Sequence, residues 1–239
     1  MFLNSFNTII ALMALDGGRS MKEIICLEED PECVESFTEG GILDEVVAHI
    51  RRGALVVYPT ETLYGLGGDP FSGSAIDRIY RVKRRPRDMG LAVATATIDD
   101  FEIVAEVPDY VWDILEDMEA VSVAFLLPRL PEVPKALTGG RDTIVVRVVH
   151  HPLATALCEG AGPIISTSAN IHGREPPRTM EEAREQLGEE VDWYIDYGEA
   201  PVQSPSTIIE PLPNGEFRLL RQGVVTSSWL DDMLSRNNG

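Results

Sequence analysis

Short apolar runs alternate with amphipathic helical patterns along most of this sequence, and this alternation limits the folds open to the chain. The runs predict buried strands, since they are too short to form buried helices. We assign strands to 23–28, 54–58, 91–95, 122–127, 143–149, 164–167, 193–196, 207–210 and 217–220. Apolar residues recur at helical spacing in the segments 42–52, 72–84, 108–118, 152–159 and 179–187. Interleaved strands and helices predict an α/β fold, a twisted mixed sheet with helices packed on it.

The ends of the predicted helices carry residues that suit helix caps. Gly53 follows the first helix and can adopt the left-handed conformation that ends many helices. Ser72 or Ser74 can cap the start of the second helix, and Ser227 or Ser228 can cap a final one.

The chain has 239 residues, enough for one large domain, and no linker or repeat interrupts residues 40–223. We expect residues 22–239 to form a single domain, and residues 1–21 to be a leader that is disordered or outside the fold. The apolar run from Ile9 to Leu15 is too short for a membrane span, which takes about 20 residues. It also lacks the preceding positive charge of a signal peptide. The sequence therefore predicts no membrane association.

Acidic residues outnumber basic ones by 39 to 20, which gives a formal net charge of -19. Such a surface repels phosphate backbones, so contact with tRNA or double-stranded RNA is disfavoured. The three cysteines, Cys26, Cys33 and Cys158, form neither a disulfide framework nor a paired metal motif. Free thiols in a reducing compartment predict a cytoplasmic protein.

The predicted strand 54–58 runs into a segment rich in hydroxyls and glycines, YPTETLYGLGGD at 58–69. Glycines allow close approach of the backbone to a ligand, and hydroxyls can bind its polar groups. An ordinary turn between a strand and a helix would have a similar composition.

Five basic residues lie within a stretch of seven, at Arg81, Lys83, Arg84, Arg85 and Arg87. A positive cluster in such an acidic chain favours a phosphate site, since Arg and Lys are the side chains that bind phosphate oxygens. The alternative is a solvated helix end whose charges suit the helix dipole.

Two further strands end in polar residues. The strand 164–167 ends in Ser166 and Thr167 and is followed by Ser168-Ala169-Asn170, at the kind of strand end where α/β proteins bind ligands. Thr143 and Arg147 share one face of another strand, and the arginine there needs an anionic partner, such as an amino-acid carboxylate or an internal acid. The histidines show no metal-binding spacing, and no nucleophile motif is present.

Taken together, these segments resemble the YrdC-like family of threonylcarbamoyl-adenylate synthases over about residues 40–223. The resemblance rests on PTETLYGLG at 59–67, KRRP at 83–86, SAN at 168–170, ST at 206–207 and RQG at 221–223, in family order. It implies a single twisted α/β domain around a deep, positively lined cleft. It also implies a nucleotidyltransferase that makes threonylcarbamoyl-AMP and pyrophosphate from L-threonine, bicarbonate and ATP, normally with Mg²⁺. The product serves tRNA modification through a separate tRNA threonylcarbamoyl transferase.

The resemblance also implies roles for individual residues. No catalytic residue separate from binding and no protein-bound metal is implied. The positions that match threonine-binding ones are Thr62, Arg147, Ser166 and Ser206. The positions that match ATP-binding ones are Lys83, Arg85, Thr143, Ser168, Asn170 and Arg221.

Several positions depart from the family pattern. The family has Asn-Pro-Leu where MGL stands at 89–91, and a histidine where Ala94 stands. Its Pro-Gly-Pro-x-Thr motif appears as AVSVA at 120–124, and His172 and Pro176 stand where the family has serines. The alternative to a synthase is therefore a diverged, non-catalytic paralogue that binds nucleotide or RNA in the same cleft.

Overall fold

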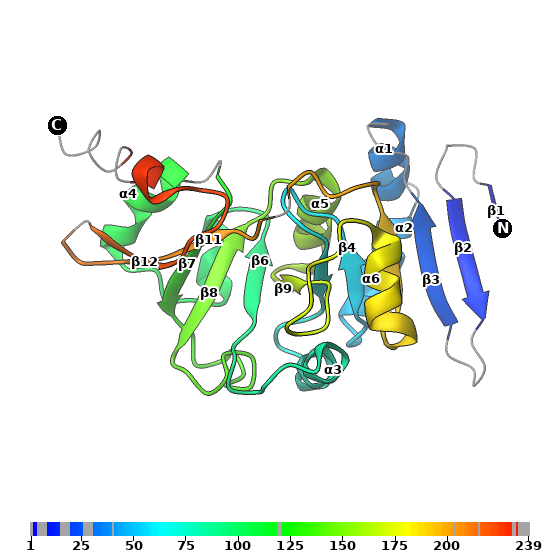
Figure 1. The fold of residues 1–239 in the computed structure, drawn as a ribbon, viewed down its shortest axis with the longest axis horizontal. Helices are drawn as coiled ribbons and strands as arrows, with labels where there is room; N and C mark the ends of the chain where they lie inside the picture. The colour runs from blue at the N-terminus through cyan, green and yellow to red at the C-terminus, as the bar shows by residue number, and fades with distance from the viewer. Residues whose placement is uncertain are drawn as a thin grey trace.

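The computed structural model describes residues 2–3, 9–14, 20–25, 31–39, 41–118, 121–202, 204–214, 216–230 and 233. Its strands are β1 (Phe2–Leu3), β2 (Ile9–Ala14), β3 (Ser20–Ile25), β4 (Val56–Tyr58), β5 (Gly65–Gly67), β6 (Ala92–Thr95), β7 (Val123–Pro128), β8 (Thr143–Val148), β9 (Ile164–Ser168), β10 (Trp193–Asp196), β11 (Thr207–Pro211) and β12 (Phe217–Arg221). They form one sheet in the order β1-β2-β3-β10-β4-β5-β9-β6-β8-β7-β11-β12 (Figure 1). The sheet is mixed, since β6 and β8 are parallel whereas β7 and β8 are antiparallel.

Helices cover both faces of this sheet. One apolar core joins the sheet to α1 (Pro31–Glu39), α2 (Ile42–Ile50) and α5 (Pro152–Ala161). The other core joins it to α3 (Gly73–Lys83), α4 (Asp109–Met118) and α6 (Met180–Leu187). The predicted α/β fold, with a mixed sheet flanked by helices, is confirmed.

The central strand β4 shows why its sequence is continuously apolar. Val57 packs into the core with α3 and α6, whereas Val56 and Tyr58 pack into the core with α2 and α5. Successive side chains of a strand point to opposite faces, so a strand covered on both faces needs apolar residues at every position.

Most predicted helix ends agree with the structure. Ser72 caps α3, where its Oγ accepts a hydrogen bond from Ala75 N at 3.3 Å, and Gly53 follows α2 with φ of 89°. The predicted cap of the final helix is wrong. The helical residues 227–230 follow Thr226, whose Oγ1 accepts a hydrogen bond from Trp229 N at 3.3 Å.

The segment 58–69 contains a strand that the sequence did not predict. β5 pairs antiparallel with both β4 and β9, and the loop that we expected is confined to residues 59–64. A Cβ on Gly65 would lie 3.0 Å from Cζ of Tyr58, so the glycines allow this strand to lie against the tyrosine ring. Glycine is depleted in strands, which is why the run looked like a turn.

The expected leader also contains strands. Ile9–Ala14 pairs antiparallel with Ser20–Ile25 and extends the sheet beyond β10, at the right-hand edge in Figure 1. An apolar run can satisfy its backbone groups by pairing in this way. The boundary of the domain at residue 21 stays a prediction.

Within the described residues, no helix combines the length and the apolar character required to cross a membrane.

Candidate functional site

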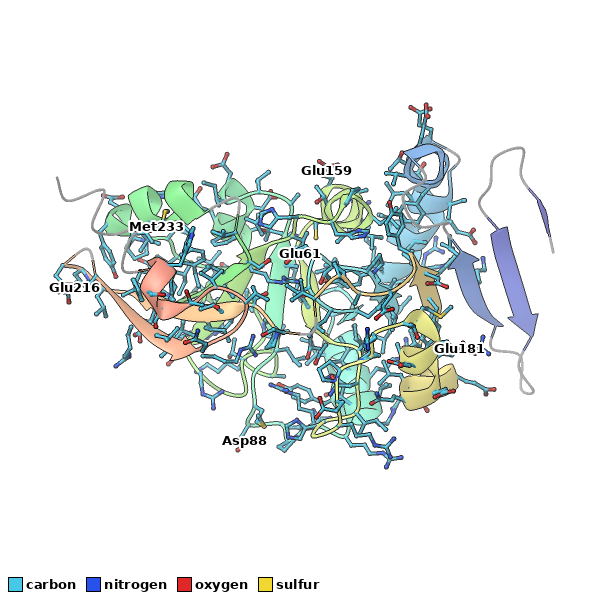
Figure 2. The ribbon with its side chains drawn as sticks, turned by 45° about the horizontal axis from the view of Figure 1, so that its top comes forward. Glu61, Asp88, Glu159, Glu181, Glu216 and Met233 are labelled. Carbon is cyan, nitrogen blue, oxygen red and sulfur yellow. The ribbon has the colours of Figure 1, made fainter. Side chains whose placement is uncertain are left out.

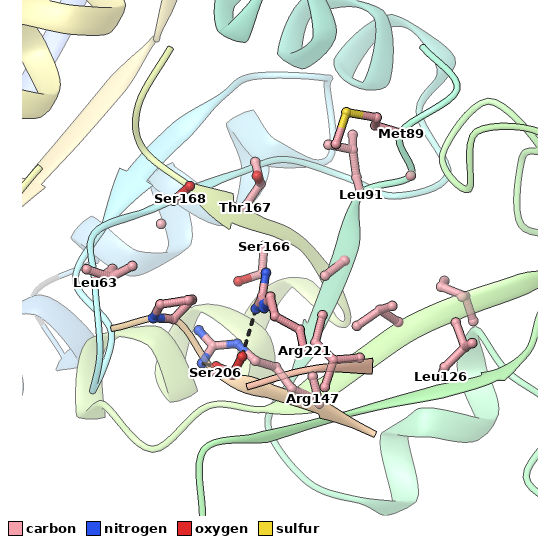
Figure 3. Close-up of a pocket in the computed structure, with 18 of the residues that line it drawn as sticks. Leu63, Met89, Leu91, Leu126, Arg147, Ser166, Thr167, Ser168, Ser206 and Arg221 are labelled. Atoms are coloured by element: carbon pink, nitrogen blue, oxygen red, sulfur yellow. Dashed lines mark hydrogen bonds between the residues drawn. The ribbon is translucent and has the colours of Figure 1, made fainter. Parts of the chain in front are cut away.

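A cavity of about 350 Å³ opens beside the centre of the sheet. Its walls come from β6, β8 and β9, from β7 and β11, and from the loop 60–64. The cavity brings together most of the residues predicted to bind ligands: Thr62, Arg85, Thr143, Arg147, Ser166, Ser168, Ser206 and Arg221. Figure 3 labels the last five of these. Their positions span residues 62–221, so only the fold makes them neighbours.

Arg147 is a buried member of this set. Its Nη1 donates hydrogen bonds to Glu61 Oε1 at 2.5 Å and to Ser206 Oγ at 2.9 Å. The arginine is only 7% exposed, and Thr62 and Ser166 beside it are also buried. The sequence left open whether Arg147 meets a substrate carboxylate or an internal acid, and the structure pairs it with Glu61.

Glu61 is held as a carboxylate by its surroundings. It accepts hydrogen bonds from Ser122 Oγ at 3.0 Å and from His150 N at 3.2 Å, besides the one from Arg147. Burial raises the pKa of the Glu61 carboxyl, but the charge of Arg147 and these hydrogen bonds outweigh burial and lower it. Figure 2 shows Glu61 at the centre of the molecule, whereas Asp88 and Glu216 lie on its outside. The sequence did not single out Glu61, although it lies inside the 58–69 motif.

The loop 60–64 is fixed by a buried threonine. Thr60 Oγ1 accepts hydrogen bonds from Thr62 N at 3.2 Å and from Leu63 N at 3.1 Å. Thr60 Oγ1 also donates to Leu63 O at 2.6 Å. These bonds replace regular pairing in the loop and hold Thr62 against the cavity.

Ser206 links two arginines of the cavity. Its side chain accepts a hydrogen bond from Arg147, and its carbonyl oxygen accepts one from Arg221 Nη2 at 2.8 Å. Gly223 allows the chain after β12 to lie close by, since a Cβ there would be 2.1 Å from Pro205 O. This contact explains why an Arg-x-Gly pattern suits the position.

Arg85 also donates to backbone carbonyls, to Met89 O at 3.0 Å and to Gly90 O at 2.8 Å. A carbonyl orients a guanidinium without neutralising it, so the positive charge remains available to a ligand. Burial, followed by the charges of Arg147 and Arg85, lowers the pKa of Arg221. The guanidinium groups of Arg85, Arg147 and Arg221 are therefore close enough for their charges to repel one another.

Lys83 and Asn170 lie beside the cavity and are not among the residues that line it. Lys83 is 1% exposed, and its Nζ donates to Ser168 O and, at 2.7 Å, to Asn170 O. Asn170 Nδ2 donates to Ile171 O at 3.0 Å and to Arg174 O at 2.6 Å. Burial, and then the charge of Arg85, lowers the pKa of Lys83 to about 7. In this structure both residues hold the turn that follows β9.

The basic cluster predicted at 81–87 is divided by the fold. Arg85 alone among its five members lines the cavity. Arg81 forms an ion pair with Glu190 at 3.1 Å, and Arg87 forms one with Asp77 at 2.5 Å. These two belong to the solvated helix end that was the alternative interpretation of the cluster.

Among the residues that the structure describes, no three His, Cys, Asp or Glu side chains are grouped as a metal site would need.

Comparisons with known proteins agree on one family. The family model Sua5_yciO_yrdC, described as telomere recombination, matches residues 48–223. The threonylcarbamoyl-AMP synthase of Idiomarina loihiensis is 40% identical over 174 residues, which cover 71% of this chain and 92% of that protein.

Two solved structures share the fold. P. abyssi Sua5 complexed with L-threonine has a TM-score of 0.77 and 30% identity, and covers 88% of this chain. This chain spans 60% of that protein. E. coli YciO has a TM-score of 0.73 and 26% identity, and the match covers 86% of this chain and 97% of YciO.

Proposed function

This chain belongs to the Sua5, YciO and YrdC family, and from that premise we propose that it is a threonylcarbamoyl-AMP synthase. Its substrates are L-threonine, bicarbonate and ATP, and its products are threonylcarbamoyl-AMP and pyrophosphate. The product supplies the threonylcarbamoyl group of modified adenosine in tRNA, by transfer to a tRNA threonylcarbamoyl transferase in the cytoplasm.

One observation carries the proposal. The described residues that line the cavity include four arginines and no acidic residue, although the whole chain has a net charge of -19. A positive cavity in so acidic a protein selects for anions, and ATP is the most highly charged of the three substrates.

L-Threonine binds at the Arg147 end of the cavity in this proposal. Arg147 receives the substrate carboxylate, and the hydroxyls of Thr62, Ser166 and Ser206 bind its polar groups. The pairing of Arg147 Nη1 with Glu61 supports this role, because it fixes the guanidinium plane before substrate arrives. A relative with 30% identity is known as a complex with L-threonine.

ATP occupies the remainder of the cavity in this proposal. Arg85, Arg221, Thr143 and Ser168 contact it directly. Lys83 and Asn170 support the turn that presents Ser168, and Lys83 adds to the positive field below its pKa of about 7. Mg²⁺ enters with the phosphates of ATP.

The chemistry needs no protein nucleophile. The amino group of threonine and bicarbonate form a carbamate with loss of water, and a carbamate oxygen then attacks the α-phosphorus of ATP as pyrophosphate leaves. The protein holds the two substrates in line and stabilises the charge that develops on phosphate oxygens. Fixed arginines at the two ends of the cavity can do both.

The test is release of pyrophosphate from ATP and bicarbonate, with and without L-threonine, with L-serine as the control amino acid. Release that requires both L-threonine and bicarbonate supports the synthase. ATP binding without any release would identify a diverged binding protein instead, with Met89 and Ala94 as the first positions to restore to the family's Asn and His. Release with serine as fast as with threonine would reject threonine as the specific substrate.

A further inference from the structure

Arg141 is the fourth arginine of the cavity, and sequence patterns did not point to it. It lies in the short connection between Thr138 and the start of β8, far along the chain from the basic cluster at 81–87. Its side chain is exposed, whereas Arg147 deeper in the cavity is buried. Arg141 therefore stands where a ligand would enter or leave.

The other three arginines of the cavity each donate to an acceptor of the protein, as described above. Arg141 differs, because its side chain makes no hydrogen bond or ion pair with any residue in the described part of the chain. The adjacent carboxylate is not free to neutralise it, since Asp142 pairs with Arg129 and Lys135, each at 3.4 Å. An unpaired guanidinium at the mouth of a cavity is available for an anionic ligand.

The backbone that carries Arg141 is fixed. Thr138 Oγ1 donates to Arg141 O at 2.6 Å, and Gly139 and Gly140 take positive φ angles of 64° and 85°. Gly139 also packs against the backbone of Asp88, where an added Cβ would lie 2.5 Å from Asp88 O. The turn with Arg141 thus rests on the loop that orients Arg85.

The charges of Arg141 and Arg85 act on the same neighbour. Burial raises the pKa of the Tyr80 hydroxyl, and the charges of Arg85, Arg87 and Arg141 partly offset that rise. Tyr80 OH shares its one proton between Met89 O and Ala136 O, both at 3.1 Å, and so ties the two loops together. Arg85 and Arg141 therefore present their charges from two connected loops.

From this geometry, and resting on the ATP-dependent function proposed above, we propose that Arg141 binds the pyrophosphate part of ATP together with Arg85. The α-phosphorus has to meet the carbamate near Arg147, at the buried end of the cavity. The β- and γ-phosphates then extend towards the mouth, where a cation without an internal partner is available. Arg141 distinguishes a nucleoside triphosphate from a monophosphate by this contact.

The experiment measures binding of ATP, AMP and inorganic pyrophosphate separately by calorimetry, without threonine or bicarbonate. Arg141→Gln removes the charge, and Arg141→Lys retains it without the planar fork. Arg218→Gln is the matched control, because Arg218 is exposed on β12, pairs with Glu210 and is outside the cavity. We expect Arg141→Gln to weaken ATP and pyrophosphate roughly tenfold, the effect of losing one exposed charged hydrogen bond.

The same variant should leave AMP affinity within about twofold, and Arg141→Lys should recover part of the loss. Unchanged ATP affinity in Arg141→Gln would overturn the proposal, as would an equal loss for AMP and ATP. Arg218→Gln losing as much as Arg141→Gln would also overturn it, since the effect would then be one of overall charge. A wild-type protein that binds ATP but makes no threonylcarbamoyl-AMP would refute the synthase. The binding measurements on the Arg141 variants would still decide the role of Arg141. A wild type that binds neither ATP nor pyrophosphate would refute both.

Discussion

The buried lysine beside the cavity should make folding stability depend on pH. Lys83 is 1% exposed, and among the described residues its hydrogen-bond partners are two carbonyl oxygens and no carboxylate. Burial lowers its pKa from 10.5 to about 7. The folded protein therefore binds fewer protons than the unfolded chain between these two pH values, so stability should rise with pH through that window.

The size of the effect follows from the shift. A fall of the Lys83 pKa from 10.5 to about 7 corresponds to at most about 5 kcal/mol, reached only above pH 10.5. Between pH 7 and pH 9, linkage gives a gain of roughly 2 kcal/mol in the free energy of unfolding. Below pH 7 the gain is absent, because the lysine is protonated in both states.

The assay is urea unfolding of the wild type and of Lys83→Met at several pH values from 6.5 to 9. The difference between the two curves isolates Lys83, because other titrating groups contribute equally to both proteins. Lys135→Met is the control, since its side chain is 66% exposed and its difference from the wild type should not change with pH. If Lys83→Met does not fold, Lys83→Gln keeps a donor for the two carbonyls and serves the same purpose.

A wild-type minus Lys83→Met difference that stays constant between pH 7 and pH 9 would refute the reasoning. It would mean that Ser168 O and Asn170 O stabilise the ammonium enough to cancel the effect of burial. Lys83 would then remain charged beside the cavity throughout the physiological pH range.

Three further predictions follow from the contacts of the site. Arg85→Ala should weaken ATP binding by about 1.5–3 kcal/mol, the scale of a charged hydrogen bond. Unchanged ATP affinity in calorimetry would mean that Arg85 only stabilises its loop. Glu61→Gln should raise KM for threonine more than it lowers kcat, because Arg147 loses the charge that orients it; a fall in kcat as large as the rise in KM for threonine would contradict this. Gly223→Ala should cost about 1–3 kcal/mol of stability in urea unfolding, since its Cβ would lie 2.1 Å from Pro205 O, and a wild-type midpoint would show that the chain can move aside.

Much of the fold could be predicted from local pattern. The strand 54–58 was predictable because a strand buried on two faces is apolar at every position. The helix 72–84 was predictable from the helical spacing of its apolar residues. β5 was not, because Gly65 and Gly67 have no side chains to show periodicity, and only the packing of the Tyr58 ring beneath them reveals a strand.

The same division holds for the site. Motif order along the chain identified Thr62, Arg85 and six other residues that line the cavity, since each motif keeps its own local spacing, but it did not identify Arg141. Local spacing cannot report which groups a side chain meets. The pairing of Glu61 with Arg147 joins residues 86 positions apart, and the enclosure of Lys83 by the carbonyls that follow β9 joins residues 85 and 87 positions apart.

By itself, the sequence determined the α/β class, most element limits and the family, because these depend on side-chain pattern over a few residues. Only the tertiary structure decided which partner each charged side chain has. Arg147 has a carboxylate, Arg85 has backbone carbonyls, and Arg141 has no partner within the described residues. The physical reason is that the free energy of a charge depends on its burial and its nearest partners, and long-range packing sets both.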